Sequence, residues 1–179
     1  MNTPLNEPVV TVLLETPFFD VIDVNDGTRP VGKGYKVVRE PKAVNGVVVL
    51  PVLADGRIAL ASLMRRAIGQ VSIEAPRGKI DDDETPEQAA ERELLEELGM
   101  KALKVTLVGK LHSNTSLLSS SVAVCVASVS GEVESETDGE VEHTMIKSMQ
   151  EIKAMIGRGE ITDGHTLSAL MMLICQAED

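Results

Sequence analysis

The chain has 179 residues, 43% hydrophobic and 25% charged, a composition typical of a globular protein with a buried core. Its formal net charge of -11 argues against non-specific nucleic-acid binding, because that binding needs Lys and Arg to neutralise phosphates. The chain has no Trp, one Tyr and two Phe, which argues against a base-stacking surface for single strands. No apolar run approaches the ~20 residues of a membrane helix, so we expect no membrane partner.

Several segments carry the apolar and β-branched patterns of strands. In chain order, they are residues 9–15, 18–24, 34–40, 46–54, 57–66, 71–76, 104–113, 122–130 and 143–148. Asp55-Gly56 is the strongest turn signal, and it predicts a hairpin between the fourth and fifth segments.

Residues 86–98 are predicted to form a helix because both ends are marked. Thr85 is a good N-cap, and Gln88 completes a Thr-x-x-Gln capping box. Pro86 suits the first helical position, and Gly99 lies where a left-handed residue commonly follows a helix.

Two further helices are predicted near the end of the chain. Ser148 and Glu151 form a second capping box, opening a helix that stops at Gly157 or Gly159, and residues 165–177 form a last helix with an apolar face. Strands before, between and after helices predict an α/β protein with a mixed sheet and helices on its faces.

Cys125 and Cys175 lie in apolar runs and form no CxxC pair, which predicts buried thiols in a reducing cytosol. The first residues lack the basic and apolar regions of a signal peptide, and a cytoplasmic location is therefore expected. His165, at the start of the last helix, is expected at the surface.

Three carboxylates share one face of the helix at 86–98. Glu93, Glu96 and Glu97 are three and four residues apart, so their charges repel one another, and two of them lie near the helix C-terminus, where the macrodipole disfavours anions. One explanation is a solvated acidic stripe. The other is a site for Mg²⁺ or Mn²⁺, which prefer oxygen ligands and would turn the repulsion into attraction.

The residues around the glutamates favour the metal site. From Gly78 to Met100 the sequence is G-x5-E-x7-R-E-U-x-E-E-x-G-U, where U is apolar. This pattern resembles the Nudix box, and its seven fixed identities in one 23-residue frame make a chance match improbable. The strand before it and the capped helix within it are the context that the box requires.

The resemblance implies a Nudix hydrolase with an α/β/α sandwich fold, in which a metal-activated water attacks the pyrophosphate of a nucleoside diphosphate derivative. The implied metal ligands are the carboxylates of Glu93, Glu96 and Glu97 and the backbone carbonyl of Arg77. Gly78 would let the backbone bend there. Arg92 would orient a glutamate of the box, with Glu84 as its partner, and the implied catalytic residues include Glu84, Arg92, Glu96 and Glu97.

Residues 46–78 resemble the segment before the box in ADP-ribose pyrophosphatases, which typically contains Q-Y-R and then E-L-P-A-G. Arg65 and Glu74 match, and the resemblance implies that both lie at the substrate or metal site. Residues 157–171 also resemble the last turn and helix of that branch. The usual Ser-Pro-Gly loop is replaced by residues 114–120, which are more similar to bacterial ADP-compound hydrolases and include Ser116 as a candidate substrate ligand.

A late acidic loop completes the site in that branch. Glu140 lies at about the matching place and is a candidate metal ligand or base, with Asp138 and Glu142 as rivals. A base from the box itself is the alternative. The aromatic side chain that would stack on adenine is not fixed by the pattern, and the candidates are Phe18, Phe19 and Tyr35.

The resemblance also implies an organisation and a substrate. Residues 1–45 would form an N-terminal β extension that builds a homodimer and shapes the pocket, and residues 46–179 would form the Nudix domain. The expected substrates are ADP-ribose, NADH or diadenosine polyphosphates, with AMP and a phosphorylated moiety as products. The alternatives are a nucleotide sugar of the GDP-mannose type, a nucleoside triphosphate or capped RNA, and a non-catalytic module that senses a nucleotide.

Overall fold

The computed structural model describes residues 8–30, 32–40, 44–133, 137, 139 and 141–176, and for residues 44 and 45 only the backbone. The chain divides into two compact units. One comprises Met1–Asn45 with His112–Ser121, and the other comprises Gly46–Leu111 with Val122–Asp179. The predicted domain boundary after residue 45 stays a prediction, and the sequence did not indicate that residues 112–121 belong with the N-terminal strands.

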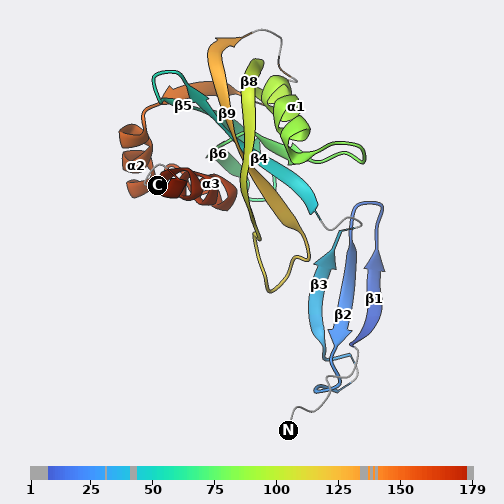
Figure 1. Cartoon of the computed structure of the whole chain (residues 1–179). Helices are drawn as coiled ribbons and strands as arrows, with labels where there is room; N and C mark the ends of the chain where they lie inside the picture. Colours follow the sequence, from blue (N-terminus) through green and yellow to red (C-terminus); the bar gives the residue numbers. More distant parts are fainter. Residues whose placement is uncertain are drawn as a thin grey trace. The chain divides into compact units, whose positions relative to one another are not determined.

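The first unit is a three-stranded antiparallel sheet in the order β1-β2-β3 (Figure 1). Its strands are β1 (Val9–Glu15), β2 (Asp20–Asn25) and β3 (Tyr35–Arg39), close to the predicted segments. The loop from the later segment continues this sheet, because Val38 N donates to the carbonyl of Leu117 at 2.7 Å and its carbonyl accepts from Ser119 N at 3.1 Å.

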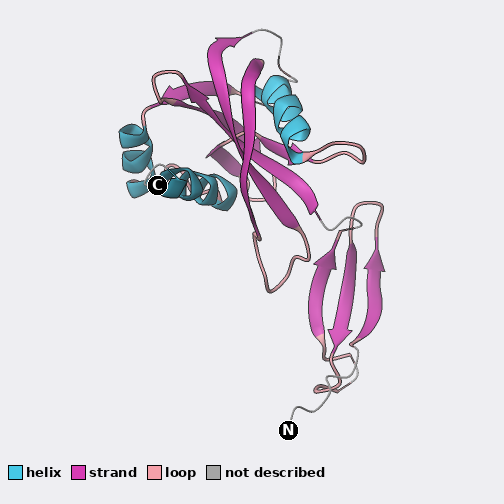
Figure 2. Cartoon of the chain, viewed as in Figure 1, coloured by secondary structure: helices cyan, strands magenta, loops and turns pink. Residues whose placement is uncertain are grey.

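The second unit is built on a seven-stranded sheet with helices beside it (Figure 2). Its strands are β4 (Val44–Leu53), β5 (Ile58–Arg65), β6 (Gln70–Glu74), β7 (Arg77–Lys79), β8 (Met100–Leu111), β9 (Ser121–Val133) and β10 (His143–Lys147). The main order is β10-β5-β4-β9-β8, with β6 paired to β5 and β7 paired to β4. The predicted hairpin at Asp55-Gly56 joins β4 to β5, and Gly56 has the positive φ of 81° that this turn requires.

Three helices complete the second unit. Helix α1 (Pro86–Leu98) has the predicted Thr85–Gln88 capping box and ends at Gly99, which has a left-handed φ of 65°. Helix α2 (Met149–Gly157) opens with the predicted Ser148–Glu151 capping box. Helix α3 (Gly164–Gln176) begins one residue before its predicted start.

The central strand β4 shows why the helices cover both faces of the sheet (Figure 1). Val47 and Val49 pack in the core cluster that contains the apolar face of α1, whereas Val48 and Leu50 pack in the cluster that contains residues of α2 and α3. All four are fully buried, and burying each stabilises the fold by roughly 1.5–3 kcal/mol. The predicted α/β/α sandwich with a mixed sheet is confirmed.

Some local predictions need correction. Cys125 is buried as expected, but Cys175 is exposed. Strand β8 begins at Met100, four residues before its predicted start, and the short strand β7 was not predicted. Within the described ranges, no helix is long and apolar enough to cross a membrane.

Candidate active site

The acidic face of α1 is divided between buried and exposed carboxylates. Glu93 and Glu97 are only 8% and 6% exposed, whereas the side chain of Glu96 is 47% exposed. Glu93 and Glu97 are therefore not part of a solvated acidic stripe, and their burial needs compensating partners.

For Glu93 this compensation comes from Arg92. Its Nε and Nη2 donate to the two carboxylate oxygens of Glu84, both at 2.8 Å, so the predicted Arg92–Glu84 pair is present and bidentate. Its Nη1 donates to Glu93 Oε1 at 2.7 Å and to Glu96 Oε2 at 3.1 Å, and Nη2 also donates to the carbonyl of Lys79 at 2.8 Å. One guanidinium thus ties three carboxylates to the strand that precedes the helix.

Gly78 lies directly against the buried carboxylate of Glu93. A Cβ at this position would overlap the Glu93 carboxyl group. Gly78 has no positive φ and sits in the regular strand β7. The predicted reason for this glycine, a backbone bend, is therefore replaced by another: only glycine lets the backbone approach the carboxylate so closely.

The electrostatics of this group depend on burial. Burial raises the pKa of Glu93, an effect that the charges of Glu96 and Glu84 reinforce and that Arg92 opposes. The hydrogen bonds from Arg92 lower the pKa of Glu84 to about 2. Glu84 is therefore ionised at neutral pH, while burial disfavours the ionised form of Glu93.

A second charged cluster surrounds Glu74 at the end of β6. Glu74 is buried, and its Oε2 accepts from Arg65 Nη2 at 2.7 Å and from Arg77 Nε at 2.8 Å. Burial alone would raise the pKa of Glu74, but the hydrogen bonds from both arginines hold it below its ordinary value. Arg65 and Glu74, which were predicted at the site, are brought together, and the side chain of Arg77 joins them.

The two clusters are electrostatically connected. The hydrogen bonds to Glu74 raise the pKa of Arg65, and the charges of Glu97 and Asp163 add to this effect. Arg65 therefore lies within electrostatic reach of both the acidic face of α1 and the turn that opens α3.

The sequence prediction missed this turn before α3. His165 was expected at the surface, but its Nδ1 lies 2.7 Å from Arg77 Nη1, and Asp163 Oδ1 lies 3.4 Å from Arg77 Nη2. The hydroxyl of Thr166 accepts from the backbone N–H of Ala75 at 2.9 Å. The sequence feature that could have indicated a role for this turn is the resemblance of residues 157–171 to the last turn and helix of the ADP-ribose branch.

The donor set fits a hard divalent cation, although no described group of three or more acidic, Cys or His side chains already has the geometry to hold one. Glu93 and Glu96 both accept a hydrogen bond from Arg92 Nη1. The space between the Gly78 backbone and the Glu93 carboxylate has no room for a Cβ. Carboxylate and carbonyl oxygens are the ligands that Mg²⁺ and Mn²⁺ prefer.

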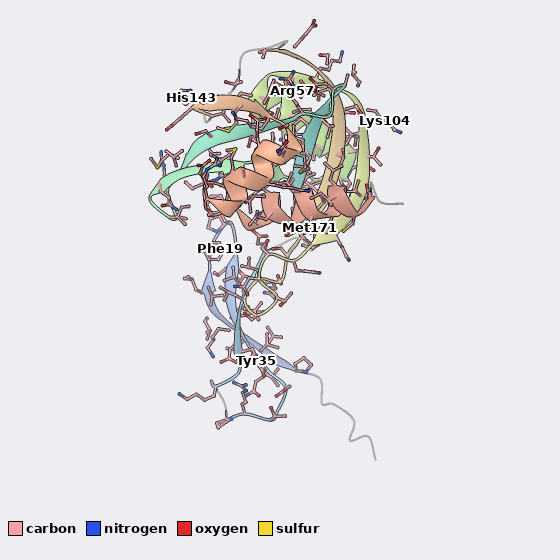
Figure 3. All side chains as sticks on the ribbon, turned by 90° about the vertical axis from the view of Figure 1, so that its left-hand side faces the viewer. Phe19, Tyr35, Arg57, Lys104, His143 and Met171 are labelled. Atoms are coloured by element: carbon pink, nitrogen blue, oxygen red, sulfur yellow. The ribbon has the colours of Figure 1, made fainter. Side chains whose placement is uncertain are left out.

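The other predicted site residues lie in the first unit, outside the described residues or just before β10. Ser116 belongs to the first unit, where its N–H and hydroxyl bond to Asn114 Oδ1. Phe19 and Tyr35 also belong to that unit and are exposed (Figure 3). Glu140 and Asp138 lie outside the described residues, and Glu142 is exposed, with its N–H bonded to the carbonyl of Ser62 at 2.8 Å.

Two carboxylates of the capped helix α1, those of Glu93 and Glu96, are thus tied by Arg92 to the glycine-containing strand β7 of an α/β/α sandwich. A family model of the NUDIX domain matches residues 42–169. The chain belongs to the Nudix family, and the prediction that it is an enzyme of this family is confirmed.

Relatives and solved structures agree with this assignment. The chain is 31% identical over 160 residues to the ADP-ribose pyrophosphatase of Bacillus subtilis (strain 168), with 86% of this chain and 85% of that protein covered. It is 46% identical over 54 residues to the RNA pyrophosphohydrolase of Aeromonas hydrophila, but this covers only 30% of this chain and 29% of that protein. A crystal structure of an ADP compounds hydrolase shares the fold, with a TM-score of 0.78, 22% identity and coverage of 99% of this chain and 97% of that one.

Proposed function

We propose that this Nudix enzyme hydrolyses the pyrophosphate bond of ADP-ribose or a related ADP compound such as NADH or a diadenosine polyphosphate. The products are AMP and a phosphorylated second moiety. The observation that carries the proposal is the complete box, with Glu93 held between Arg92 and Gly78. The similarity to an ADP-ribose pyrophosphatase over 86% of the chain supports the ADP branch.

Mg²⁺ or Mn²⁺ is the proposed cofactor, held by the carboxylates of Glu93, Glu96 and Glu97 with the backbone carbonyl of Arg77. When bound, the metal supplies a nucleophilic water at neutral pH and neutralises charge on the pyrophosphate. The chain itself contributes position. Arg92 holds the carboxylates of Glu93 and Glu96 on one side of α1, so little reorganisation remains when substrate binds.

Two groups of the second unit are proposed to act on the substrate or its proton. Arg65 lies near Glu97, carries a raised pKa and keeps a partly exposed side chain, which suits it to a phosphate. Glu96 is the more exposed carboxylate of the helix and can accept a proton from the attacking water. Glu140 stays the proposed loop contribution, and Asp138 and Glu142 stay its rivals.

The first unit is proposed to build a homodimer and to shape the nucleotide pocket together with Ser116. Apolar side chains on both faces of β1 are exposed, including Val9, Val10, Val12, Leu13 and Leu14, with exposures of 47–67%. Exposed apolar surface of this kind marks an interaction site. Phe18, Phe19 and Tyr35 stay the candidate stacking residues, and one face of the Tyr35 ring carries the guanidinium of Arg29, 4.2 Å from the ring centroid, as a cation–π pair.

A turnover panel tests the proposal. The full chain is incubated with Mg²⁺ and ADP-ribose, NADH, diadenosine compounds, GDP-mannose or ADP-glucose, and released AMP or GMP is quantified. AMP release from ADP-ribose, NADH or a diadenosine compound, lost in Glu97→Gln, is the expected result. Release of GMP alone would replace the proposal with a nucleotide-sugar pyrophosphatase. Nucleotide binding without turnover of any compound would replace it with a nucleotide-sensing module.

A further inference from the structure

We propose that Thr166, with Asp163 and His165, is a positioning residue of the active site that holds the turn from Glu74 to Gly78 in place for metal binding. This inference rests on the proposed function, because it assigns the Arg77 carbonyl and Gly78 to the metal site. Hydrogen bonds join this turn to the beginning of α3.

The turn has one backbone donor between the end of β6 and the start of β7. Pro76 has no N–H, so the amide of Ala75 is the donor at this point. Ala75 is buried and its N–H donates to the Thr166 hydroxyl at 2.9 Å. A buried amide must find a partner inside the protein, so this bond fixes the position of the turn relative to α3.

Asp163 aims the Thr166 hydroxyl at Ala75. The carboxylate Oδ2 of Asp163 accepts from the N–H and from the hydroxyl of Thr166, both at 2.8 Å. The hydroxyl hydrogen is thereby committed to Asp163, which leaves the oxygen lone pairs for the amide. Thr166 is fully buried, so water cannot replace either partner.

The side chain of Arg77 makes a second attachment between the turn and α3. Its Nη1 donates to His165 Nδ1 at 2.7 Å, its Nη2 lies 3.4 Å from Asp163 Oδ1, and its Nε donates to Glu74 at 2.8 Å. The guanidinium is thus drawn toward α3 and Glu74.

The opposite side of the turn is already fixed by the sheet. Val49 N donates to the carbonyl of Pro76 at 2.9 Å, and Val48 pairs with Arg77. Only the α3 side depends on Thr166. Loss of that bond leaves the Arg77 side chain as the described attachment to α3 and loosens the segment before Gly78, where the close approach to Glu93 leaves no spare room.

The experiment compares Thr166→Val, which keeps the side-chain volume and removes the hydroxyl, with Thr166→Ser, which restores the hydroxyl. Mn²⁺ binding to the full chain is measured by the electron paramagnetic resonance of free Mn²⁺, a readout that needs no turnover. We expect about tenfold weaker Mn²⁺ binding in Thr166→Val, the size of loss typical of groups that orient metal ligands. Thr166→Ser should bind Mn²⁺ within about twofold of the wild type.

Ser168→Ala is the matched control, because its hydroxyl bonds only locally to the carbonyl of Gly164 at 2.7 Å on the same helix. It should leave Mn²⁺ binding unchanged. Equal weakening in Ser168→Ala and Thr166→Val would mean that general loosening of α3 is responsible, which overturns the proposal. Wild-type Mn²⁺ binding in a folded Thr166→Val protein overturns it as well.

His165→Ala covers the case in which Thr166→Val does not fold, because the side chain of His165 keeps 18% of its surface exposed whereas Thr166 is fully buried. We expect about threefold weaker Mn²⁺ binding, and unchanged binding would overturn the proposal.

The two proposals fail separately. Weakened Mn²⁺ binding in an enzyme that turns over no ADP compound removes the proposed function and keeps the positioning role. Turnover of ADP-ribose by the wild type, with unchanged Mn²⁺ binding in Thr166→Val, keeps the proposed function and removes the positioning role.

Discussion

The two units of the chain differ most in what they bury. In the described part of the first unit, Ile22 is the one hydrophobic side chain that is buried, and all of β1 is exposed. The second unit has two core clusters, one on each face of its sheet. The exposed apolar residues of the first sheet are the surface on which the proposed dimer is tested, whereas the second unit has a core on each face of the sheet that carries its charged clusters.

The same contrast holds for buried carboxylates. In the first unit, Asp23 is buried with one oxygen bonded to Lys36 at 2.5 Å and with Oδ1 lacking a hydrogen-bond partner. In the second unit, Glu74 is held by two arginines. Glu74 of the second unit thus has two charged donors, whereas Asp23 of the first unit has one and keeps an oxygen without a hydrogen-bond partner.

The largest expected effect falls on the charges of the second unit. Glu97→Gln removes a proposed metal ligand and should lower turnover by about 100- to 1,000-fold, comparable to the loss of one transition-state stabilising group. The fold should persist, because the isosteric amide keeps the packing. Turnover assays with circular dichroism measure both. Glu91→Gln, on the exposed side of α1, is the control, and equal losses in both variants would contradict the assignment.

The contrast between the units is also tested at β1. Leu13→Lys places a charge on the exposed apolar strand and should weaken the proposed dimer by at least tenfold, which corresponds to about 1.4 kcal/mol. Sedimentation or light scattering over a dilution series measures the dissociation. Leu103→Lys, at an exposed position on β8 of the second unit, should leave the oligomeric state unchanged. A monomeric wild-type protein at all concentrations would refute the dimer.

The tight packing around the box is tested by Gly78→Ala. The added methyl group overlaps the Glu93 carboxylate and should lower the free energy of unfolding by about 1–3 kcal/mol. Urea denaturation measures this change. Gly157→Ala is the control, because a Cβ there meets nothing within 4 Å. Equal stability of Gly78→Ala and the wild type would show that the strand can move away from α1.

The smallest effect concerns Glu84. Its pKa is lowered from 4.5 to about 2, so its contribution to stability is present above pH 4.5 and is lost as the pH falls through about 2. The wild type should exceed Glu84→Gln in stability by on the order of 1 kcal/mol at neutral pH, and the difference should vanish near pH 2. Denaturation at several pH values measures it, and a difference independent of pH would contradict the ion pair.

The sequence predicted best where the signals are local. Helix α1 was placed to the residue because Thr85, Gln88 and Gly99 mark its ends within the segment itself. The box residues follow from one continuous pattern for the same reason. Strand β7 was missed because three residues with a central glycine carry no periodicity.

Contacts between distant residues were not predictable in this way. Nothing near His165 in the sequence indicates Arg77, which lies 88 residues earlier. The pairing of residues 117–119 with β3 is equally remote from local patterns. The role of Gly78 was misjudged because a close approach between a strand and a helix is visible only in three dimensions.

The bond between Ala75 and Thr166 also has a consequence for the timing of protein synthesis. The two residues are separated by 91 positions in the chain. At a synthesis rate of roughly 5–20 residues per second, about 5–20 seconds pass between the addition of Ala75 and that of Thr166. Helix α1 is therefore translated well before Thr166. During that interval the nascent chain contains Glu93, Glu96 and Glu97 but lacks the hydroxyl that bonds to the turn at Ala75.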